Sequence, residues 1–237
     1  MAPIVLIHGA WHGAWCWGRL IPALAARGRE AIAIDLPGAG DDTTPLASVT
    51  LDLYAKRVVE TLEHLAEPAV LVGHSMGGLS ITAAAERAPE RIAKLVYLCA
   101  YLPRDGESLL GLAGQIDPAD VVMKTNFSAD GLSVTVEDDG IKPAFYGDCR
   151  DEDVAFAKAR LKPLAVQPAA ATMHVTADRF GRVPRVYIEC TEDRAIPIAH
   201  QRAMAAAASP IEVHTLNTSH SPFFSAPDAL AEILAKL

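Results

Sequence analysis

The residues best suited to chemistry form a Gly-x-Ser-x-Gly motif at residues 73–77. An apolar run, partly β-branched, precedes the motif at residues 69–72, and an alanine-rich segment follows it. Between a strand and a helix, this motif holds its serine on a strained turn with the hydroxyl exposed above the edge of the sheet. Gly73 and Gly77 supply the small neighbours that such a turn requires. We therefore predict that Ser75 is a nucleophile.

A serine nucleophile needs a base, and His220 is the histidine that we predict for this role. It stands in a polar loop after the last expected strand, where the chain order Ser, Asp, His places the base. His74 is adjacent to Ser75, but neighbours along a strand project to opposite faces. The other six histidines fall in the first glycine-rich loop or in expected helices, strands and connections: His8, His12, His64, His174, His200 and His214.

The base is itself oriented by an acid, and Asp193 is our prediction for that group. Asp193 follows an expected strand that ends near Cys190, and it precedes His220 in the chain. Glu192 would point away if Asp193 points into the site. Asp105 also follows an expected strand and is the alternative acid. A purely local role for Asp193, as a turn or helix-capping residue, stays open at this point.

An acyl-transfer site also needs hydrogen-bond donors for the oxyanion that forms when a carbonyl is attacked. The backbone N–H of Met76, directly after the serine, is one predicted donor. The second is the N–H of Ala10, because residues 8–10 form a His-Gly-x sequence after the first expected strand. We also predict that Gly9 and Trp11 contact the substrate.

Strand-like and helix-like segments alternate along the chain, which predicts a doubly wound, mostly parallel α/β sheet with helices on both faces. Six apolar runs are the expected strands: residues 3–8, 31–36, 69–74, 93–102, 185–190 and 211–216. The main expected helices are residues 14–27, 51–65, 79–88, 199–208 and 227–237. Thr50 or Ser48 is the expected N-cap of the helix over residues 51–65.

Residues 104–182 interrupt this alternation and are predicted to form an inserted cap, or lid. The α/β core would then comprise residues 1–103 and 183–237. In open α/β sheets ligands bind beyond the carboxyl ends of the strands, so the cap would cover the site and shape its pocket. Within the cap we expect three elements: helices near residues 107–112 and 151–161, and a strand at residues 132–136.

The composition, with 51% apolar residues and a net charge of −8 at pH 7, is that of an acidic globular protein. Without a basic cluster, neither nucleic acid nor an anionic membrane is an expected partner. No leader sequence and no apolar run long enough to span a bilayer is visible, so we expect a cytoplasmic protein; a homodimer stays open. No metal or other cofactor is expected, since no ligand set has metal-site spacing and residues 37–43 lack the third glycine of a dinucleotide fingerprint. Widely spaced cysteines are expected to be buried free thiols: Cys16, Cys99, Cys149 and Cys190.

With these residues assembled, the chain resembles the α/β-hydrolase superfamily, and within it the branch of plant methylesterases, hydroxynitrile lyases and related bacterial carboxylesterases. Four segments carry the resemblance: residues 8–15 (His-Gly-Ala-Trp-His-Gly-Ala-Trp), 73–78 (Gly-His-Ser-Met-Gly-Gly), 145–149 (Phe-Tyr-Gly-Asp-Cys) and 179–193, which begins Arg-Phe-Gly and ends Glu-Cys-Thr-Glu-Asp. The resemblance implies the minimal, six-stranded version of this fold with an inserted cap. It also implies that Asp193 is the acid.

Two positions distinguish the lyases that this branch contains. The lyases characteristically carry a threonine where this chain has Gly9 and a lysine where it has Ser221. We therefore predict a serine carboxylesterase that hydrolyses small, largely apolar carboxylic esters through an acyl-enzyme, with Ser75, His220 and Asp193 as its triad. Two alternatives stay open: a hydroxynitrile lyase, and a ligand-binding receptor that keeps the triad but turns over slowly.

Overall fold

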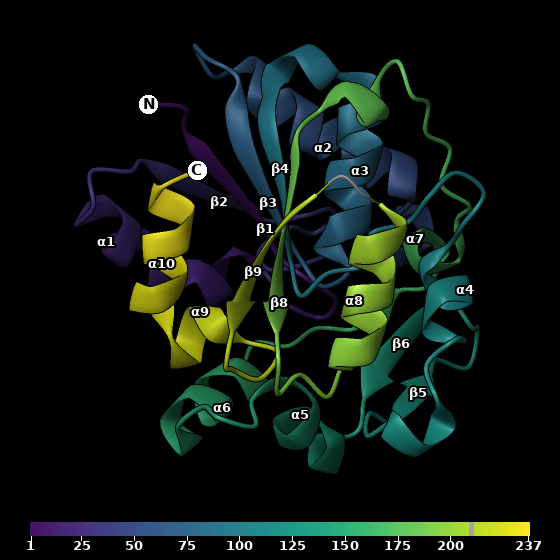
Figure 1. The fold of residues 1–237 in the computed structure, drawn as a ribbon. Coiled ribbons are helices and arrows are strands. Elements are labelled where there is room, and N and C mark those ends of the chain that lie inside the picture. Colours follow the sequence, from purple (N-terminus) through teal and green to yellow (C-terminus); the bar gives the residue numbers. More distant parts are fainter. Residues whose placement is uncertain (209–210) are drawn as a thin grey trace.

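The computed structural model describes residues 1–208 and 211–237, and its centre is a six-stranded parallel sheet (Figure 1). The strands are β1 (Ile4–Ile7), β2 (Ala31–Ile34), β3 (Ala69–His74), β4 (Ile92–Leu98), β8 (Arg185–Cys190) and β9 (Glu212–Leu216). They lie in the order β2-β1-β3-β4-β8-β9, and every neighbouring pair is parallel. The strand order reverses between β1 and β3, the point at which open α/β sheets bind their ligands. The predicted doubly wound sheet is confirmed.

Helices cover both faces of this sheet. One face carries α2 (Leu51–Glu63), α3 (Gly77–Arg87) and α8 (Ile198–Ala207), and the other carries α1 (Leu20–Ala25), α9 (Pro222–Ser225) and α10 (Pro227–Ala235) (Figure 1). Each face of the sheet has its own apolar core. Val5 and Ile7 of β1 pack in the core on the side of α2, α3 and α8, whereas Ile4 and Leu6 pack in the core on the side of α1, α9 and α10. Because both of their faces are buried, β1 and β3 appear in the sequence as almost continuous apolar runs. The edge strand β9 was also expected to be buried, but it is mostly exposed, and its sequence mixes apolar and polar residues.

The strand expected at residues 93–102 ends four residues early, at Leu98. Cys99 has a φ of +34°, in the left-handed region that non-glycine residues seldom adopt, so the extended chain stops there. The N–H of Tyr101 then donates to the carbonyl oxygen of Ser75 at 3.1 Å. The end of β4 therefore turns toward the predicted nucleophile instead of continuing the sheet.

The predicted helices lie where expected along the chain, but their first and last residues differ from those predicted. The helix expected over residues 14–27 is a 3₁₀ turn, Ala14–Gly18, followed by the short helix α1. Thr50 caps α2, because its hydroxyl accepts the N–H of Leu53 at 3.1 Å. No helix among the described residues is long and apolar enough to cross a membrane. All four cysteines are buried and free, as expected.

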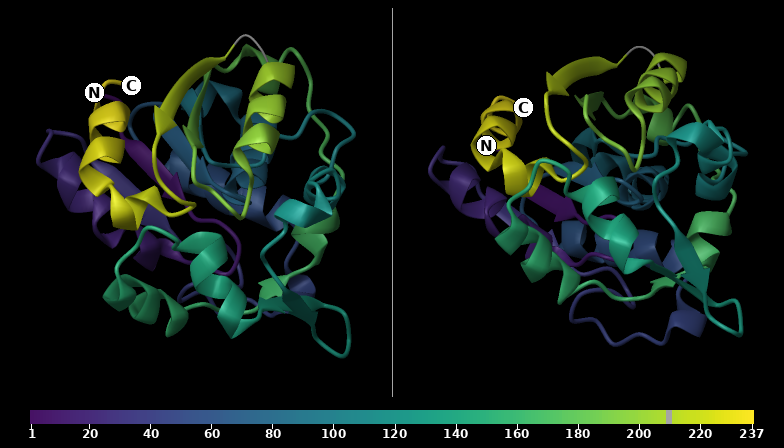
Figure 2. Two further views of the ribbon diagram at one scale, coloured as in Figure 1. Left: turned by 60° about the horizontal axis from the view of Figure 1, so that its bottom comes forward. Right: turned by 90° about the horizontal axis from the view of Figure 1, so that it is seen from below.

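Residues 104–182, which we call the cap segment, leave the sheet after β4 and return to it at β8. Their elements are α4 (Leu109–Ala113), β5 (Thr125–Phe127), β6 (Ser133–Val136), α5 (Asp138–Phe145), α6 (Asp151–Lys158), β7 (Leu164–Ala165) and α7 (Gln167–Ala170). The strands β5, β6 and β7 form a separate antiparallel sheet. Helices α5 and α6 lie beyond the carboxyl ends of β8 and β9 (Figures 1 and 2).

The helix α5 was not predicted from the sequence. Its Asp138, Asp139 and Gly140 read as the end of the preceding strand, and Pro143 lies inside the helix. The two aspartates occupy the first turn, where negative charge favours the helix dipole. Pro143 is the sixth of the eight residues, where its missing N–H removes one helical hydrogen bond. This missed helix carries Phe145, which lies at the candidate site.

Candidate active site

Ser75 stands on the turn between β3 and α3, with a φ of +54°. This is the left-handed region, in which a serine is strained. The N–H of Ser75 donates to the carbonyl of Leu98 at 3.2 Å, and its carbonyl accepts the N–H groups of Gly78 and Tyr101 at 3.1 Å each. Hydrogen bonds from β4 and α3 thus hold the strained turn that the motif predicts.

Small residues let this turn pack directly against neighbouring backbone. A β-carbon at Gly73 would lie 2.7 Å from the carbonyl oxygen of Gly77, and one at Gly77 would lie 2.7 Å from that of His8. A β-carbon at Gly9 would lie 2.8 Å from the Cβ of Ser75. Each approach is closer than real β-carbons tolerate. The glycines therefore bring the loop after β1 into contact with the nucleophile turn.

His220 and Asp193 form a buried pair, with His220 Nδ1 2.7 Å from one carboxylate oxygen. The other oxygen accepts the N–H groups of Ala195 and Ile196 at 2.8 Å each. Asp193 therefore has the local turn role that the sequence left open and also contacts His220. The carboxylate favours the tautomer with the proton on Nδ1, which leaves Nε2 of His220 able to accept a proton.

Gln201 of α8 completes the hydrogen bonds around Asp193, and sequence reasoning missed it. This fully buried side chain donates from Nε2 to the Asp193 carboxylate at 3.1 Å. Its Oε1 accepts the N–H of Cys190, also at 3.1 Å, which fixes the amide's orientation. Glutamines are mostly exposed in proteins, and one on an alanine-rich helix gives no sign of such a role. Gln201 acts through Asp193 and is a positioning residue.

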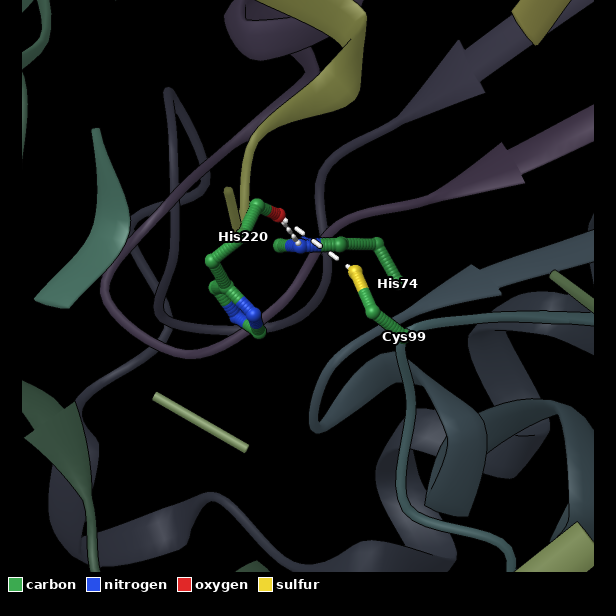
Figure 3. A group of neighbouring side chains, drawn as sticks. All are labelled: His74, Cys99 and His220. Atoms are coloured by element: carbon green, nitrogen blue, oxygen red, sulfur yellow. Dashed lines mark hydrogen bonds between the residues drawn. The ribbon is translucent and has the colours of Figure 1, made fainter. Parts of the chain in front are cut away.

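The backbone of His220 is held by two side chains from the core. His74 Nε2 lies 2.8 Å from the His220 carbonyl oxygen and Cys99 Sγ lies 3.4 Å from it (Figure 3), and the ring centroids of His74 and His220 lie 4.5 Å apart. Two histidines and a cysteine also resemble a metal-ligand set. Burial raises the pKa of the Cys99 thiol well above its usual value, so the thiol keeps its proton and can donate to the His220 carbonyl oxygen. The sequence had not predicted these positioning contacts.

Asp148 of the cap segment holds the same loop from the other side. Its carboxylate accepts the N–H of Ser219 at 3.0 Å and also the Ser219 hydroxyl. Ser219 directly precedes His220 in the chain. The two hydrogen bonds from Ser219 to Asp148 therefore connect the loop of the predicted base to the cap segment. Asp148 belongs to the segment at residues 145–149 that carried part of the family resemblance, although no role was predicted for it.

Ala10 and Met76, the predicted oxyanion donors, are both buried and both line the cavity at Ser75. Neither backbone N–H donates to another group within residues 1–208 and 211–237. Buried amides without an acceptor are rare in folded proteins. Met76 also immediately precedes α3, whose positive dipole end favours a negative charge at this place. The two amides can therefore accept an anionic oxygen.

A cavity of about 60 Å³ opens over Ser75. Its walls are almost entirely apolar and come from both the core and the cap segment; they include Tyr101, Leu109, Met123, Phe145, Leu164 and Ile196. None of the described residues that line it has a charged side chain. A larger surface groove of about 510 Å³, beside α2 and α7, is lined by none of the predicted site residues. The chemistry of the side chains, rather than the volume, therefore identifies the site.

One contact expected from the sequence is not made, and the alternative acid lies elsewhere. Within the described residues the Ser75 hydroxyl makes no hydrogen bond to His220, although Phe145 lines the serine's cavity and its ring centroid lies 5.8 Å from that of His220. Such contacts commonly tighten only when substrate binds. Asp105, the alternative acid, is exposed, accepts the N–H of Val175 at 3.1 Å and is not brought to His220.

Three buried histidines surround the site. Burial lowers the pKa of His8 and His74, and it lowers the pKa of His12 to about 3. The ring nitrogens of His12 lie 2.7 Å from the carbonyl oxygen of Ala10 and 2.6 Å from the hydroxyl of Tyr146. His12 therefore connects the loop after β1 to the cap segment while remaining uncharged.

Between about pH 6.5 and pH 4.5, we expect the free energy of unfolding to decrease as the pH falls. In this window the unfolded chain protonates His12, whereas the folded chain keeps it neutral because its pKa there is about 3; the lowered pKa values of His8 and His74 act in the same direction. Each histidine that stays neutral only in the folded state therefore lowers the free energy of unfolding by about 1.4 kcal/mol for each pH unit of acidification. Urea unfolding at several pH values measures the slope, which His12→Gln should reduce by one histidine's share. The same substitution at exposed His64 is the matched control. An unchanged slope in His12→Gln would contradict the prediction.

The profile of the alpha/beta hydrolase family matches residues 4–233 of this chain. Methylesterase 1 of Arabidopsis thaliana is 34% identical, over 98% of this chain and 94% of its own length. Putative methylesterase 14, chloroplastic, of the same plant is 32% identical, over 98% of this chain and 71% of its own length. The crystal structure of polyneuridine aldehyde esterase matches with a TM-score of 0.90 at 28% identity, covering 100% of this chain and 98% of that one.

The chain therefore belongs to the alpha/beta hydrolase family. Within this family it lies in the branch of the methylesterases and related esterases, as its sequence motifs had indicated.

Proposed function

We propose that this protein is a serine carboxylesterase in which Ser75 attacks the ester, His220 is the base and Asp193 orients the base. The broad class, a carboxylic ester hydrolase, is that of the methylesterases and esterases to which the chain is related. The observation that carries the finer proposal is the buried His220–Asp193 pair, 2.7 Å apart. It lies at the same sheet edge as the strained Ser75 turn.

In the first half of the reaction, His220 Nε2 accepts the Ser75 hydroxyl proton while Oγ bonds to the carbonyl carbon of the ester. The carbonyl oxygen becomes negative and accepts hydrogen bonds from the N–H groups of Ala10 and Met76. Asp193 stabilises the positive imidazole that forms. The imidazole then gives its proton to the alcohol oxygen as the ester C–O bond breaks, and the acyl group stays on Ser75.

In the second half, a water molecule replaces the alcohol. His220 accepts a proton from this water as its oxygen bonds to the acyl carbon, and the same two amides again bind the oxyanion. His220 then returns a proton to Ser75 Oγ as the acyl–oxygen bond breaks. The carboxylic acid leaves and the starting state is restored, with each step using only groups of this chain and water.

The cavity supports an uncharged substrate of small size. Its volume of about 60 Å³ suits a short acyl or alcohol group, and its walls offer apolar contact without a charged partner. A carboxylate or ammonium group on the substrate would lose its hydration there without gaining an ion pair. We therefore propose small, largely apolar esters as the substrate class.

A hydroxynitrile lyase is the main alternative, and residue 9 argues against it. A threonine here, as in the lyases of this branch, would place its β-carbon 2.8 Å from the Cβ of Ser75. The nucleophile turn would have to move to admit it. Ser221, where the lyases carry a lysine, is fully buried, and its hydroxyl has no partner among the described residues.

A fluorophosphonate reagent tests the proposal, because it reacts covalently with an activated serine. We expect one label per chain, located at Ser75 by peptide mass spectrometry, with parallel loss of p-nitrophenyl acetate hydrolysis. Label on another residue, or full hydrolysis by the labelled protein, would refute the assignment. Rapid cyanide release from mandelonitrile with negligible ester turnover would favour the lyase, and a single burst without further turnover would favour a receptor.

A further inference from the structure

The cavity over Ser75 ends at a wall that also bounds a second cavity. Trp11, Met76 and Leu164 line both spaces. The second cavity is small, about 10 Å³, which is room for a single water molecule. Tyr54 is among the residues on its far side, together with backbone and side chains around Ala39. The three shared residues therefore form a partition between two spaces.

Trp11 is the largest member of this partition, and its place is fixed from outside its own loop. Its φ of +62° is strained for a residue other than glycine, at a cost of about 1–2 kcal/mol. Its indole N–H donates to the carbonyl of Val134 at 2.9 Å, and its own carbonyl accepts the N–H of Lys162 at 3.1 Å. Both partners belong to the cap segment. The cap segment thus holds the indole in the wall against the local preference of the backbone.

The space beyond the partition offers a polar group as well as room. Tyr54 is only 2% exposed, and its hydroxyl makes no hydrogen bond within residues 1–208 and 211–237. Burial raises the pKa of this phenol, so the hydroxyl keeps its proton and can donate. Because Tyr54 lines the second cavity, its phenol can donate to a water or to a polar atom of a ligand there. The second cavity is therefore a place where additional substrate atoms could be accommodated once the partition opens.

We propose that Trp11 sets the upper size limit of the ester by closing the cavity over Ser75 against the second cavity. The inference rests on the proposed esterase function and adds a specificity-determining residue to it. With the indole in place, the site takes only short groups. Removal of the indole frees the volume that it occupies. The two cavities then become one continuous pocket that passes Met76 and reaches Tyr54.

Substrate series of increasing length test this proposal in Trp11→Gly. Glycine is chosen because it adopts a positive φ without strain. One series extends the acyl chain, from p-nitrophenyl acetate to octanoate, and the other extends the alcohol, from ethyl to octyl acetate. Each accommodated methylene is worth up to about fourfold in kcat/KM. We expect the long-to-short ratio of kcat/KM to rise at least about tenfold in one series, which identifies the group that enters the second cavity.

Three further variants separate the partition from other effects. Leu164→Ala opens the same wall from the cap segment without touching the loop of Ala10, and it should shift the same series. Leu109→Ala removes the same atoms from a wall of the first cavity alone, so the ratio should change much less. Trp11→Phe keeps a blocking ring but loses the bond to Val134, and it should retain the preference for short chains.

Unchanged ratios in both Trp11→Gly and Leu164→Ala would overturn the inference. So would a shift in Leu109→Ala or Trp11→Phe as large as that in Trp11→Gly. If Trp11→Gly loses its fold or all activity, Leu164→Ala decides the question alone. None of these results affects the proposed function, which would instead fail if the wild-type protein hydrolysed no ester or did so without Ser75.

Discussion

Replacement of Ser75 by alanine is expected to lower kcat for p-nitrophenyl acetate by about 10⁶-fold, the order of loss that follows removal of the subtilisin nucleophile. Among the described residues the Ser75 hydroxyl makes no hydrogen bond, so its removal leaves no partner unsatisfied. The variant loses one oxygen atom, and the backbone hydrogen bonds of the turn do not involve that atom. We therefore expect circular dichroism and urea unfolding to show a folded protein of nearly unchanged stability.

Ser80→Ala is the matched control for this prediction. Ser80 lies on α3, five residues further along, and its buried hydroxyl has no hydrogen-bond partner among the described residues. Ser80→Ala removes the same kind of oxygen atom close by in the chain but away from the cavity, so kcat should stay within a factor of about two. Retention of more than about 1% of the wild-type kcat in purified Ser75→Ala, against the loss expected from such nucleophiles, would mean that another group attacks the ester.

The sequence predicted those parts of the site that are specified by local pattern. Ser75 could be identified because a strand, a glycine-flanked serine and a helix follow one another within some twenty residues. His220 and Asp193 were chosen from the sequence because each follows an expected strand and both come after Ser75 in the order Ser, Asp, His. The parallel sheet then brings the carboxyl ends of those strands to one edge.

The supporting contacts could not be predicted, because they join residues far apart in the chain through ordinary residue types. Gln201 reaches Asp193 from the next helix, and Asp148 reaches Ser219 across 71 residues. His74 appeared in the sequence only as a neighbour that faces away from Ser75, and its actual contact lies 146 residues further on. A local pattern specifies the backbone path, whereas these contacts depend on how the completed layers pack.

These supports also explain why the base depends on both parts of the molecule. The core holds the carbonyl of His220 through His74 and Cys99, and the cap segment holds the preceding residue through Asp148. The same segment holds Trp11 through Val134. A displacement of the cap segment would therefore disturb the base and the substrate cavity together, whereas the backbone hydrogen bonds of the Ser75 turn come from Leu98, Gly78 and Tyr101, all outside the cap segment.

Asp193→Asn should lower kcat by about 10⁴-fold, as the corresponding change does in trypsin. All four donors around this carboxylate point at it: the amides of Ala195 and Ile196, the Gln201 amide and His220 Nδ1. An asparagine oxygen can face one pair of donors, but its NH₂ group must then face the other pair. If the NH₂ group faces His220, Nδ1 must accept a hydrogen bond, so the imidazole carries its proton on Nε2. Nε2 can then no longer accept the proton of Ser75.

The comparison with Asp105→Asn makes this prediction specific to position. Asp105 is exposed, accepts one backbone N–H and lies 3.7 Å from His174, so its loss should leave kcat nearly unchanged. Steady-state kinetics on both variants, with urea unfolding to correct for the roughly 1–3 kcal/mol cost of unsatisfied donors at Asp193, measure the difference. If Asp105→Asn lost more activity than Asp193→Asn, the acid that orients His220 in solution would be Asp105. The buried 2.7 Å pair would then serve only to hold the loop.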